Sequence, residues 1–182
     1  KSAVDGLTPE TWTPLSETMY EAANYYMGRN VDYGNVGPVL SVGAARTSGN
    51  TSGTTYKRPA TLACQKNYVV FLTDGQPTRD LGATTKIKAL PDFAANVTDP
   101  TCSGAAGSNG ECLPDLAEYL YRHDLDPALA GLQNVTTYTV GFGVDLLIGD
   151  TSFLEETARL GGGQYYPATD TATLQGALTD IV

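Results

Sequence analysis

The stretch Tyr68-Val69-Val70-Phe71-Leu72-Thr73-Asp74-Gly75 decides the fold of this chain. Residues 68–73 form a continuous, apolar and β-rich run, which is typical of a central strand that is covered on both faces. The run stops abruptly at Asp74-Gly75, a dipeptide that favours a turn. We therefore predict a buried strand over 68–73 with Asp74 at its carboxyl end.

Helices and strands are predicted to alternate on both sides of this strand. Upstream, apolar residues at helical spacing predict a helix that starts after Thr13, its expected N-cap, and ends at Gly28. Downstream, the expected elements are helix 113–121, strand 135–142, helix 152–160 opened by a capping box of Ser152 and Glu155, strand 164–167, and helix 171–181 capped by Asp170. Residues 28–66 show no sustained periodicity and are interpreted as a long loop or insertion.

This order of elements predicts an α/β fold. Alternating helices and strands favour a doubly wound, largely parallel sheet that is flanked by helices on both faces. In such folds, binding sites lie beyond the carboxyl ends of the strands, where Asp74 is placed. The 182 residues, 41% of them apolar, are enough for one domain.

Charge and hydropathy argue against a nucleic-acid partner and against a transmembrane segment in this chain. Eleven Lys and Arg residues against twenty Asp and Glu residues give a net charge of −9, so nucleic acid is not an expected partner. No apolar run is long enough for a transmembrane segment or a signal peptide. We expect any export signal to lie upstream of this chain.

The three cysteines indicate an oxidising compartment. Cys102 and Cys112 flank nine residues that are mostly Gly, Ser and Ala, and such a loop cannot order itself by burial. A disulfide that closes the loop 102–112 would remove roughly 2.5–3 kcal/mol of unfolded-state entropy, and we favour it over two unrelated thiols. Cys64 is then unpaired, or pairs outside the chain. Disulfides persist outside the cytosol, so we expect an exported protein.

Two short motifs carry the functional argument, although each alone has a simpler explanation. Thr13 alone is a helix cap, and Asp74 alone is a turn residue. Together, Thr13-Pro14-Leu15 and Thr73-Asp74-Gly75 resemble two loops of the von Willebrand factor type A (vWA) domain. The resemblance implies that the Thr13 hydroxyl and the Asp74 carboxylate are ligands of a metal-ion-dependent adhesion site for Mg²⁺ or Ca²⁺.

Longer blocks narrow the resemblance to one subfamily. The blocks are T-P-L-S-E-T-M-Y-E-A (13–22), C-Q-K-N-Y-V-V-F-L-T-D-G-Q-P-T (64–78), D-L-A-E-Y-L-Y (115–121) and N-V-T-T-Y-T-V-G-F-G (134–143). They are similar to the vWA domain of PilC/PilY-like type IV pilus tip adhesins and biogenesis proteins. The resemblance implies a non-enzymatic adhesion and assembly module, outside the cell, whose partners are minor pilins of the tip complex and a host or abiotic surface ligand.

The sequence departs from the family in one respect. The D-x-S-x-S loop of the metal site is absent, and the central strand that bears this loop should precede Thr13. We therefore expect residues 1–182 to be the C-terminal portion of the domain, with the missing strands supplied by an upstream segment or another chain. Two alternatives remain open: a generic secreted vWA matrix-binding receptor, and a vWA subunit of a metal-dependent enzyme complex.

Overall fold

The sheet consists of three parallel strands. The computed structural model describes residues 12–35, 41–103, 109–143 and 151–181. Strand β1 (Asn67–Thr73) pairs with β2 (Val135–Phe142), which pairs in turn with β3 (Gly162–Ala168), in the order β1-β2-β3. The predicted α/β class, the parallel sheet and all three strands are confirmed.

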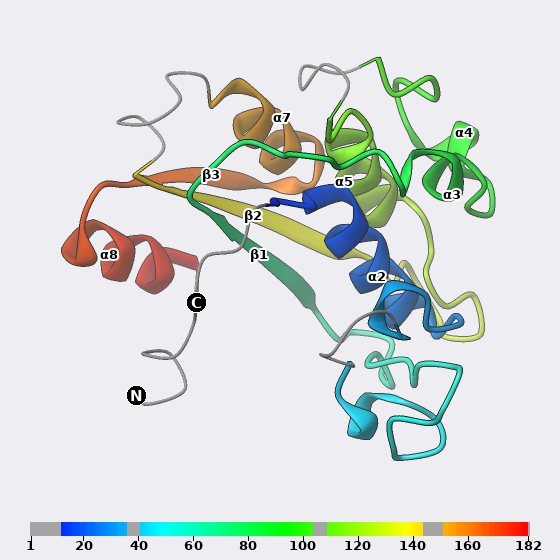
Figure 1. The fold of residues 1–182 in the computed structure, drawn as a ribbon. Coiled ribbons are helices and arrows are strands. Elements are labelled where there is room, and N and C mark those ends of the chain that lie inside the picture. The colour runs from blue at the N-terminus through cyan, green and yellow to red at the C-terminus, as the bar shows by residue number, and fades with distance from the viewer. Residues whose placement is uncertain (1–11, 36–40, 104–108, 144–150, 182) are drawn as a thin grey trace.

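Helices cover the two faces of the sheet unequally. The helices are α2 (Leu15–Met27), α3 (Thr84–Lys88), α4 (Phe93–Asn96), α5 (Leu113–Arg122), α7 (Ser152–Leu160) and α8 (Thr171–Ile181). Figure 1 shows α2, α5 and α7 on one side of the sheet and α8 on the other. Helix α8 packs on β3 and β2, so the second face of β1 lacks a covering helix in the described part of the chain.

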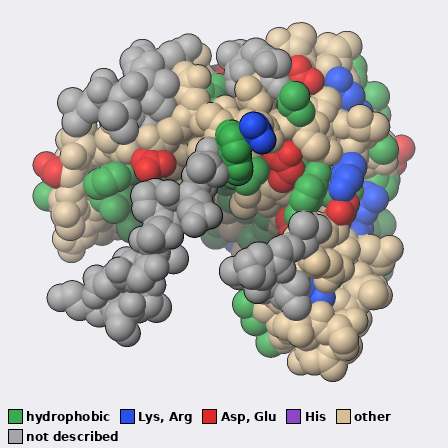
Figure 2. Space-filling view, viewed as in Figure 1, with side chains coloured by type: hydrophobic (Ala, Val, Ile, Leu, Met, Phe, Trp, Pro, Cys, Tyr) green, Lys and Arg blue, Asp and Glu red, His purple; other side chains and the backbone are tan. Residues whose placement is uncertain are grey.

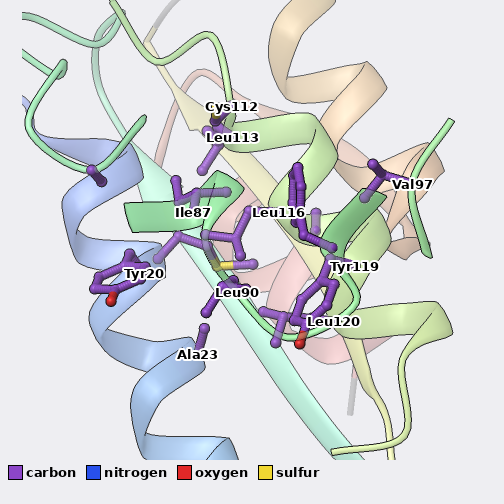
Figure 3. Packing of buried hydrophobic residues seen from close by; sticks show 14 of the residues in the cluster. Tyr20, Ala23, Ile87, Leu90, Val97, Cys112, Leu113, Leu116, Tyr119 and Leu120 are labelled. Carbon is purple, nitrogen blue, oxygen red and sulfur yellow. The ribbon is translucent and has the colours of Figure 1, made fainter. Parts of the chain in front are cut away.

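The hydrophobic core lies on the face covered by α2, α5 and α7. Leu113, Leu116 and Leu120 of α5 are fully buried and pack in one cluster with Phe71 of β1. Figure 3 shows these α5 side chains beside Ile87, which belongs to α3. The sequence suggested no helix over 84–96, because α3 and α4 are each too short to display a periodic apolar pattern.

The opposite face of β1 contradicts one prediction. Alternate side chains of the strand point to opposite faces of the sheet, and Phe71 is buried. In contrast, Tyr68, Val70 and Leu72 are 50%, 41% and 54% exposed. The expectation of a strand covered on both faces is therefore wrong for the described structure, because α8 packs on β3 and β2 and no described helix covers this face of β1. We call the surface formed by these three side chains the open face.

Of the predicted N-caps of α8 and α7, only the first is confirmed. The N–H of Thr173 donates to Asp170 Oδ1 over 2.8 Å, so the predicted cap of α8 is confirmed. Helix α7 instead has Thr151, not Ser152, at its N-cap position. The Thr151 hydroxyl donates to Glu155 Oε1 over 2.8 Å but makes no cap bond to the backbone of α7, so the prediction of Ser152 as the N-cap of a capping box is wrong.

The insertion 28–66 is held together by a buried arginine. Arg46 is fully buried, and its guanidinium donates to Asn35 Oδ1, Ser41 Oγ and the carbonyl oxygens of Gly34, Thr51 and Gly53. The described part of the insertion contains the 3₁₀ turns η1 (Tyr33–Asn35) and η2 (Gly43–Ala45). A buried charge requires hydrogen-bonding partners, and here backbone and side-chain acceptors of the insertion surround it.

The cysteines behave as the sequence predicts. Cys102 and Cys112 form a disulfide and are both buried, while residues 104–108 of the loop lie outside the described residues. Cys64 is exposed and free. None of the described helices has the length and apolar character needed to cross a bilayer.

Candidate metal site at the carboxyl end of the sheet

The two predicted metal ligands lie on adjacent segments at the carboxyl end of β1. Asp74 directly follows the strand, and its side chain is exposed. Thr13 precedes α2 and pairs with the segment that leaves β1. The N–H of Thr13 donates to Thr78 Oγ1 over 2.8 Å, and the N–H of Thr78 donates to the Thr13 carbonyl over 3.1 Å. Folding thus joins the Thr13 segment to the segment that follows Asp74, although Thr13 and Thr78 are 65 residues apart in sequence.

The turn after β1 directs Asp74 outward. The buried Thr73 uses its hydroxyl to donate to the Gly75 carbonyl over 2.8 Å, and it accepts from the Gly75 N–H over 3.2 Å. These bonds join the residues on either side of Asp74 and shape the turn locally. The Asp74 carboxylate is therefore presented to solvent at the sheet end, where open α/β sheets bind ligands.

Thr13 and Asp74 alone do not make a complete cation site. No hydrogen bond joins them within the described residues, and Mg²⁺ or Ca²⁺ takes six or more oxygen ligands. Across the described ranges there is also no group of three or more His, Cys, Asp or Glu side chains that could hold a metal ion. The residues present therefore fit part of such a site and leave most ligand positions unassigned.

The expected N-cap role of Thr13 is wrong, because Asp80 caps α2. Pro14 occupies the N-cap position and makes no side-chain cap bond. The fully buried Asp80 carboxylate accepts from the Ser16 N–H over 2.7 Å and from the Glu17 N–H over 3.2 Å. Burial raises the pKa of Asp80, and the hydrogen bonds from Ser16 oppose that rise.

Asp80 also joins three segments around the candidate site. Its N–H donates to Asn109 Oδ1 over 3.0 Å, and its carbonyl accepts from the Gly110 N–H over 3.1 Å. One residue therefore fixes the segment after β1 to the start of α2 and to the loop before α5. Sequence reasoning missed it because a cap supplied from 64 residues away leaves no local pattern.

A second group of charged residues surrounds a small cavity between α5 and α7. Asp99, Asp115, Arg122, Glu156 and Arg159 line this cavity, which has a volume of about 340 Å³. Asp115 is only 3% exposed, and burial together with the charge of Asp99 raises its pKa to about 7. This carboxyl group can take up a proton near neutral pH, a property that its helical position alone did not indicate.

The charges around Asp115 are largely paired with one another. Arg159 lies 2.6 Å from Glu156, and Arg122 lies 2.8 Å from the buried Glu118. These pairs account for both arginines of the cavity as structural residues, so we assign it no ligand.

Comparison of the chain with family models, with curated proteins and with solved structures gave no match.

Proposed function

We propose that this chain is a non-enzymatic adhesion and assembly module of the vWA type at the tip of a bacterial type IV pilus. One observation carries the proposal. The Thr73-Asp74-Gly75 motif ends a strand of a parallel α/β sheet, and the Thr13 segment is hydrogen-bonded to Thr78 in the segment that leaves this strand. This is the placement that the vWA resemblance implies for two loops of a metal-ion-dependent adhesion site.

The proposed cation is Mg²⁺ or Ca²⁺. This chain supplies two hard oxygen donors, the Thr13 hydroxyl and the Asp74 carboxylate, which suit both ions. We propose that the remaining ligands come from an upstream D-x-S-x-S loop. Cation binding is accordingly expected of a longer form of the protein and not of these 182 residues alone.

The edge of β1 supports the presence of further strands in the complete domain. Among the described residues, β1 pairs only with β2, so its other edge has no strand partner there, although the Tyr68 carbonyl accepts from the Tyr26 hydroxyl over 2.8 Å. The open face adds Tyr68, Val70 and Leu72, each 41–54% exposed. Covering three such side chains is worth roughly 1 kcal/mol each, and a bare apolar edge promotes aggregation. We infer that an upstream segment or another chain pairs with β1 and covers this face.

The proposed location is the extracellular pilus tip. The Cys102–Cys112 disulfide is consistent with export, and the net charge of −9 argues against a nucleic-acid partner. The proposed partners are minor pilins and a host or abiotic surface. Figure 2 shows hydrophobic side chains at the surface over α8. Leu178 of this helix is 44% exposed, and it adds apolar surface for assembly contacts.

The cation proposal is tested by titrating Mg²⁺ and Ca²⁺ into this chain and into a form extended upstream. We expect calorimetric binding only to the extended form, and we expect Asp74→Asn and Thr13→Ala to abolish it. Thr13→Ala retains both backbone bonds to Thr78, so its effect reports on the hydroxyl. Asp180→Asn, which changes an exposed carboxylate on α8, is the control. Cation binding that survives Asp74→Asn would refute the assignment.

The cellular role is tested separately with chromosomal variants. Deletion of the gene is expected to remove surface pili and twitching motility. The Asp74→Asn strain is expected to keep its pili but to lose EDTA-sensitive attachment. A deletion strain that assembles normal pili would instead favour the secreted matrix-binding receptor, and would exclude an assembly role.

The inferred strand pairing predicts a change in hydrogen exchange. In the extended form, the amides of β1 (Asn67–Thr73) that lack a partner in this chain should become strongly protected. The amides of α5, which is already buried, should exchange equally in both forms. Unchanged exchange across β1 would contradict the inference that an upstream segment pairs with this edge.

A further inference from the structure

We propose that a groove between α2 and the insertion 28–66 binds a lysine or arginine side chain of a partner protein. The groove has a volume of about 900 Å³. Its principal lining residues are Glu17, Glu21 and Tyr25 of α2 and Tyr33, Val42 and Tyr56 of the insertion. We call it the tyrosine groove. It involves neither Thr13 nor Asp74, so the inference does not depend on the proposed cation site.

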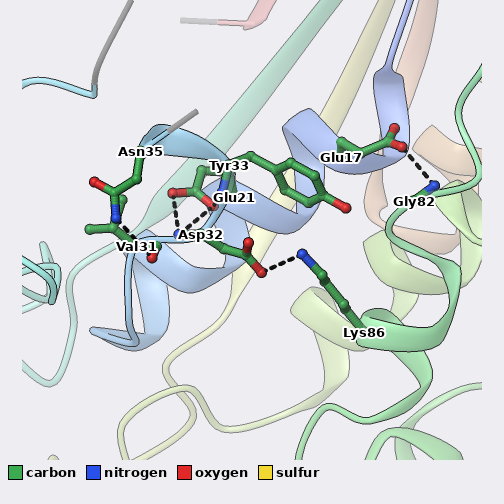
Figure 4. A network of polar contacts seen from close by, with 8 residues as sticks. All are labelled: Glu17, Glu21, Val31, Asp32, Tyr33, Asn35, Gly82 and Lys86. Carbon is green, nitrogen blue, oxygen red and sulfur yellow. Dashed lines mark hydrogen bonds and ion pairs between the residues drawn. The ribbon is translucent and has the colours of Figure 1, made fainter. Parts of the chain in front are cut away.

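One glutamate holds two of the three tyrosines in place. Glu21 accepts hydrogen bonds from the N–H groups of Asp32 and Tyr33, the latter over 3.0 Å, and from the Tyr56 hydroxyl over 2.6 Å. Burial and this bond raise the pKa of Tyr56 to about 12, so its hydroxyl stays protonated at neutral pH. Figure 4 shows Glu21 beside Asp32 and Tyr33.

The remaining wall of the groove is also ordered. Arg46 is fully buried and bonds to Ser41 Oγ, next to Val42 at the groove. Tyr25 meets the ring of Tyr56 edge to face, with the ring centroids 5.7 Å apart. Because these contacts exist without a ligand, little conformational entropy is lost when a side chain enters the groove.

The charge of the groove selects a cation. Glu17 and Glu21 both line it, and none of the described lining residues is Lys or Arg. Glu17 Oε1 accepts from the Gly82 N–H over 2.8 Å, and Glu17 Oε2 is buried without a hydrogen-bond partner among the described residues, so Glu17 acts on the groove through its charge. A carboxylate charge beside tyrosine rings suits an ammonium or guanidinium group.

The apolar part of the groove lining favours a cationic group that is carried by a hydrocarbon chain over a bare metal ion. Tyr25, Tyr33 and the 71% exposed Val42 offer apolar surface along the groove. Lysine and arginine side chains lay their methylene stems on such surfaces while the charged end reaches a polar group. A bare metal ion would leave this surface unused, and a neutral sugar would not use the charge of Glu17.

The chain already makes the same kind of contact at the rim of the groove. Lys86 Nζ lies 4.2 Å from the centroid of the Tyr33 ring and 2.7 Å from Asp32 Oδ2. Figure 4 shows Tyr33 between Lys86 and Glu17. Since Asp32 balances the charge of Lys86, the charge of Glu17 remains available to a ligand.

The proposal is tested by NMR titration of the isotopically labelled 182-residue chain, in buffer that contains EDTA. The probes are the peptides acetyl-Gly-Gly-Lys-Gly-Gly-amide and acetyl-Gly-Gly-Arg-Gly-Gly-amide. A third peptide carries norleucine at the central position and matches lysine in its hydrocarbon stem. We expect saturable shifts at residues of the tyrosine groove with the cationic peptides, and at least about fivefold weaker binding of the norleucine peptide.

Two variants locate the site. Glu17→Gln keeps an acceptor for the Gly82 N–H but removes the charge, and should weaken lysine-peptide binding about fivefold. Tyr25→Ala should weaken binding of the lysine and arginine peptides alike, and Glu155→Gln, an exposed carboxylate on α7, should have no effect. Equal binding of the norleucine peptide, an unchanged affinity in Glu17→Gln, or shifts outside the groove would each overturn the proposal. Because EDTA removes divalent cations, none of these outcomes bears on the proposed metal site.

Discussion

The two faces of the sheet differ in how completely they are covered. On the first face, Phe71 packs in a cluster with α2 and α5, whose core residues are fully buried. On the second face, the adjacent Leu72 is 54% exposed, because α8 lies on β3 and β2. Neighbouring residues of one strand, both apolar, therefore experience opposite environments. The difference shows that β1, an edge strand of the described sheet, has apolar side chains on a face that no described helix covers.

Matched leucine substitutions give the largest expected contrast between the faces. Leu116→Ala on α5, at a fully buried position, should lower the free energy of unfolding by about 3 kcal/mol, since it opens a cavity. Leu72→Ala on the open face should lower it by less than about 1 kcal/mol. Urea denaturation followed by circular dichroism measures both. Equal losses would mean that the open face is covered in solution.

The Leu72→Ala and Leu116→Ala substitutions also test whether the open face becomes covered in the form extended upstream. There, Leu72→Ala should cost about 2 kcal/mol or more, since the side chain becomes buried. Leu116→Ala should cost the same in both forms. A Leu72→Ala effect that stays small in the extended form would show that the upstream segment leaves the open face uncovered.

The covered side of the sheet should also respond to pH through Asp115. Its pKa is raised from the ordinary 3.8 to about 7 in the folded protein, so the folded state binds this proton more tightly than the unfolded chain does. The free energy of unfolding should therefore fall as the pH rises from about 4 to about 7, by roughly 2–3 kcal/mol, and level off above that range.

Asp115→Asn should remove this dependence, because the amide stays neutral. At pH 8 the variant should be more stable than the wild type, and near pH 4 the two should be alike. Denaturation at a series of pH values tests this, with Asp99, Glu118, Glu156, Arg122 and Arg159 unchanged around the site. A variant that retains the full loss of stability would assign the pH dependence to other carboxylates.

The smallest expected contrast is between two helix caps. Asp80→Ala should cost about 1–2 kcal/mol, because it leaves the N–H groups of Ser16 and Glu17 without their acceptor in a buried place. Asp170→Ala, at the exposed cap of α8, should cost about 0.5–1 kcal/mol, since water can replace the lost bond. Thermal denaturation measures both. A larger loss for Asp170→Ala would reverse the ranking of buried and exposed caps.

The sequence predicted elements whose cause is local. Strands 68–73 and 135–142 appear as β-rich runs, and the periodic spacing of α5 marks its buried side. The cap of α8 lies three residues from its partner, so Asp170 was identified correctly. The disulfide followed from the composition of the loop that it closes.

Apart from the N-cap of α7, the errors concern interactions between distant segments. Thr13 has the residue type of an N-cap, but the buried carboxylate of Asp80 takes that role from across 64 residues. The insertion 28–66 has no periodic pattern, yet Arg46 collects acceptors along it from Gly34 to Gly53. Short helices α3 and α4 depend on the packing of Ile87 and Phe93. Local patterns cannot report contacts that exist only after the chain has folded.

The sequence by itself therefore determined the α/β class, the strands, most of the helices, and the two motifs at Thr13 and Asp74. Periodicity and residue type encode these features, because backbone geometry and burial repeat along a helix or strand. Only the tertiary structure decided that the Thr13 segment pairs with the segment after β1, that one face of β1 is open, and that three tyrosines and two glutamates line a groove. These depend on which surfaces meet, and that is set by packing across the whole fold.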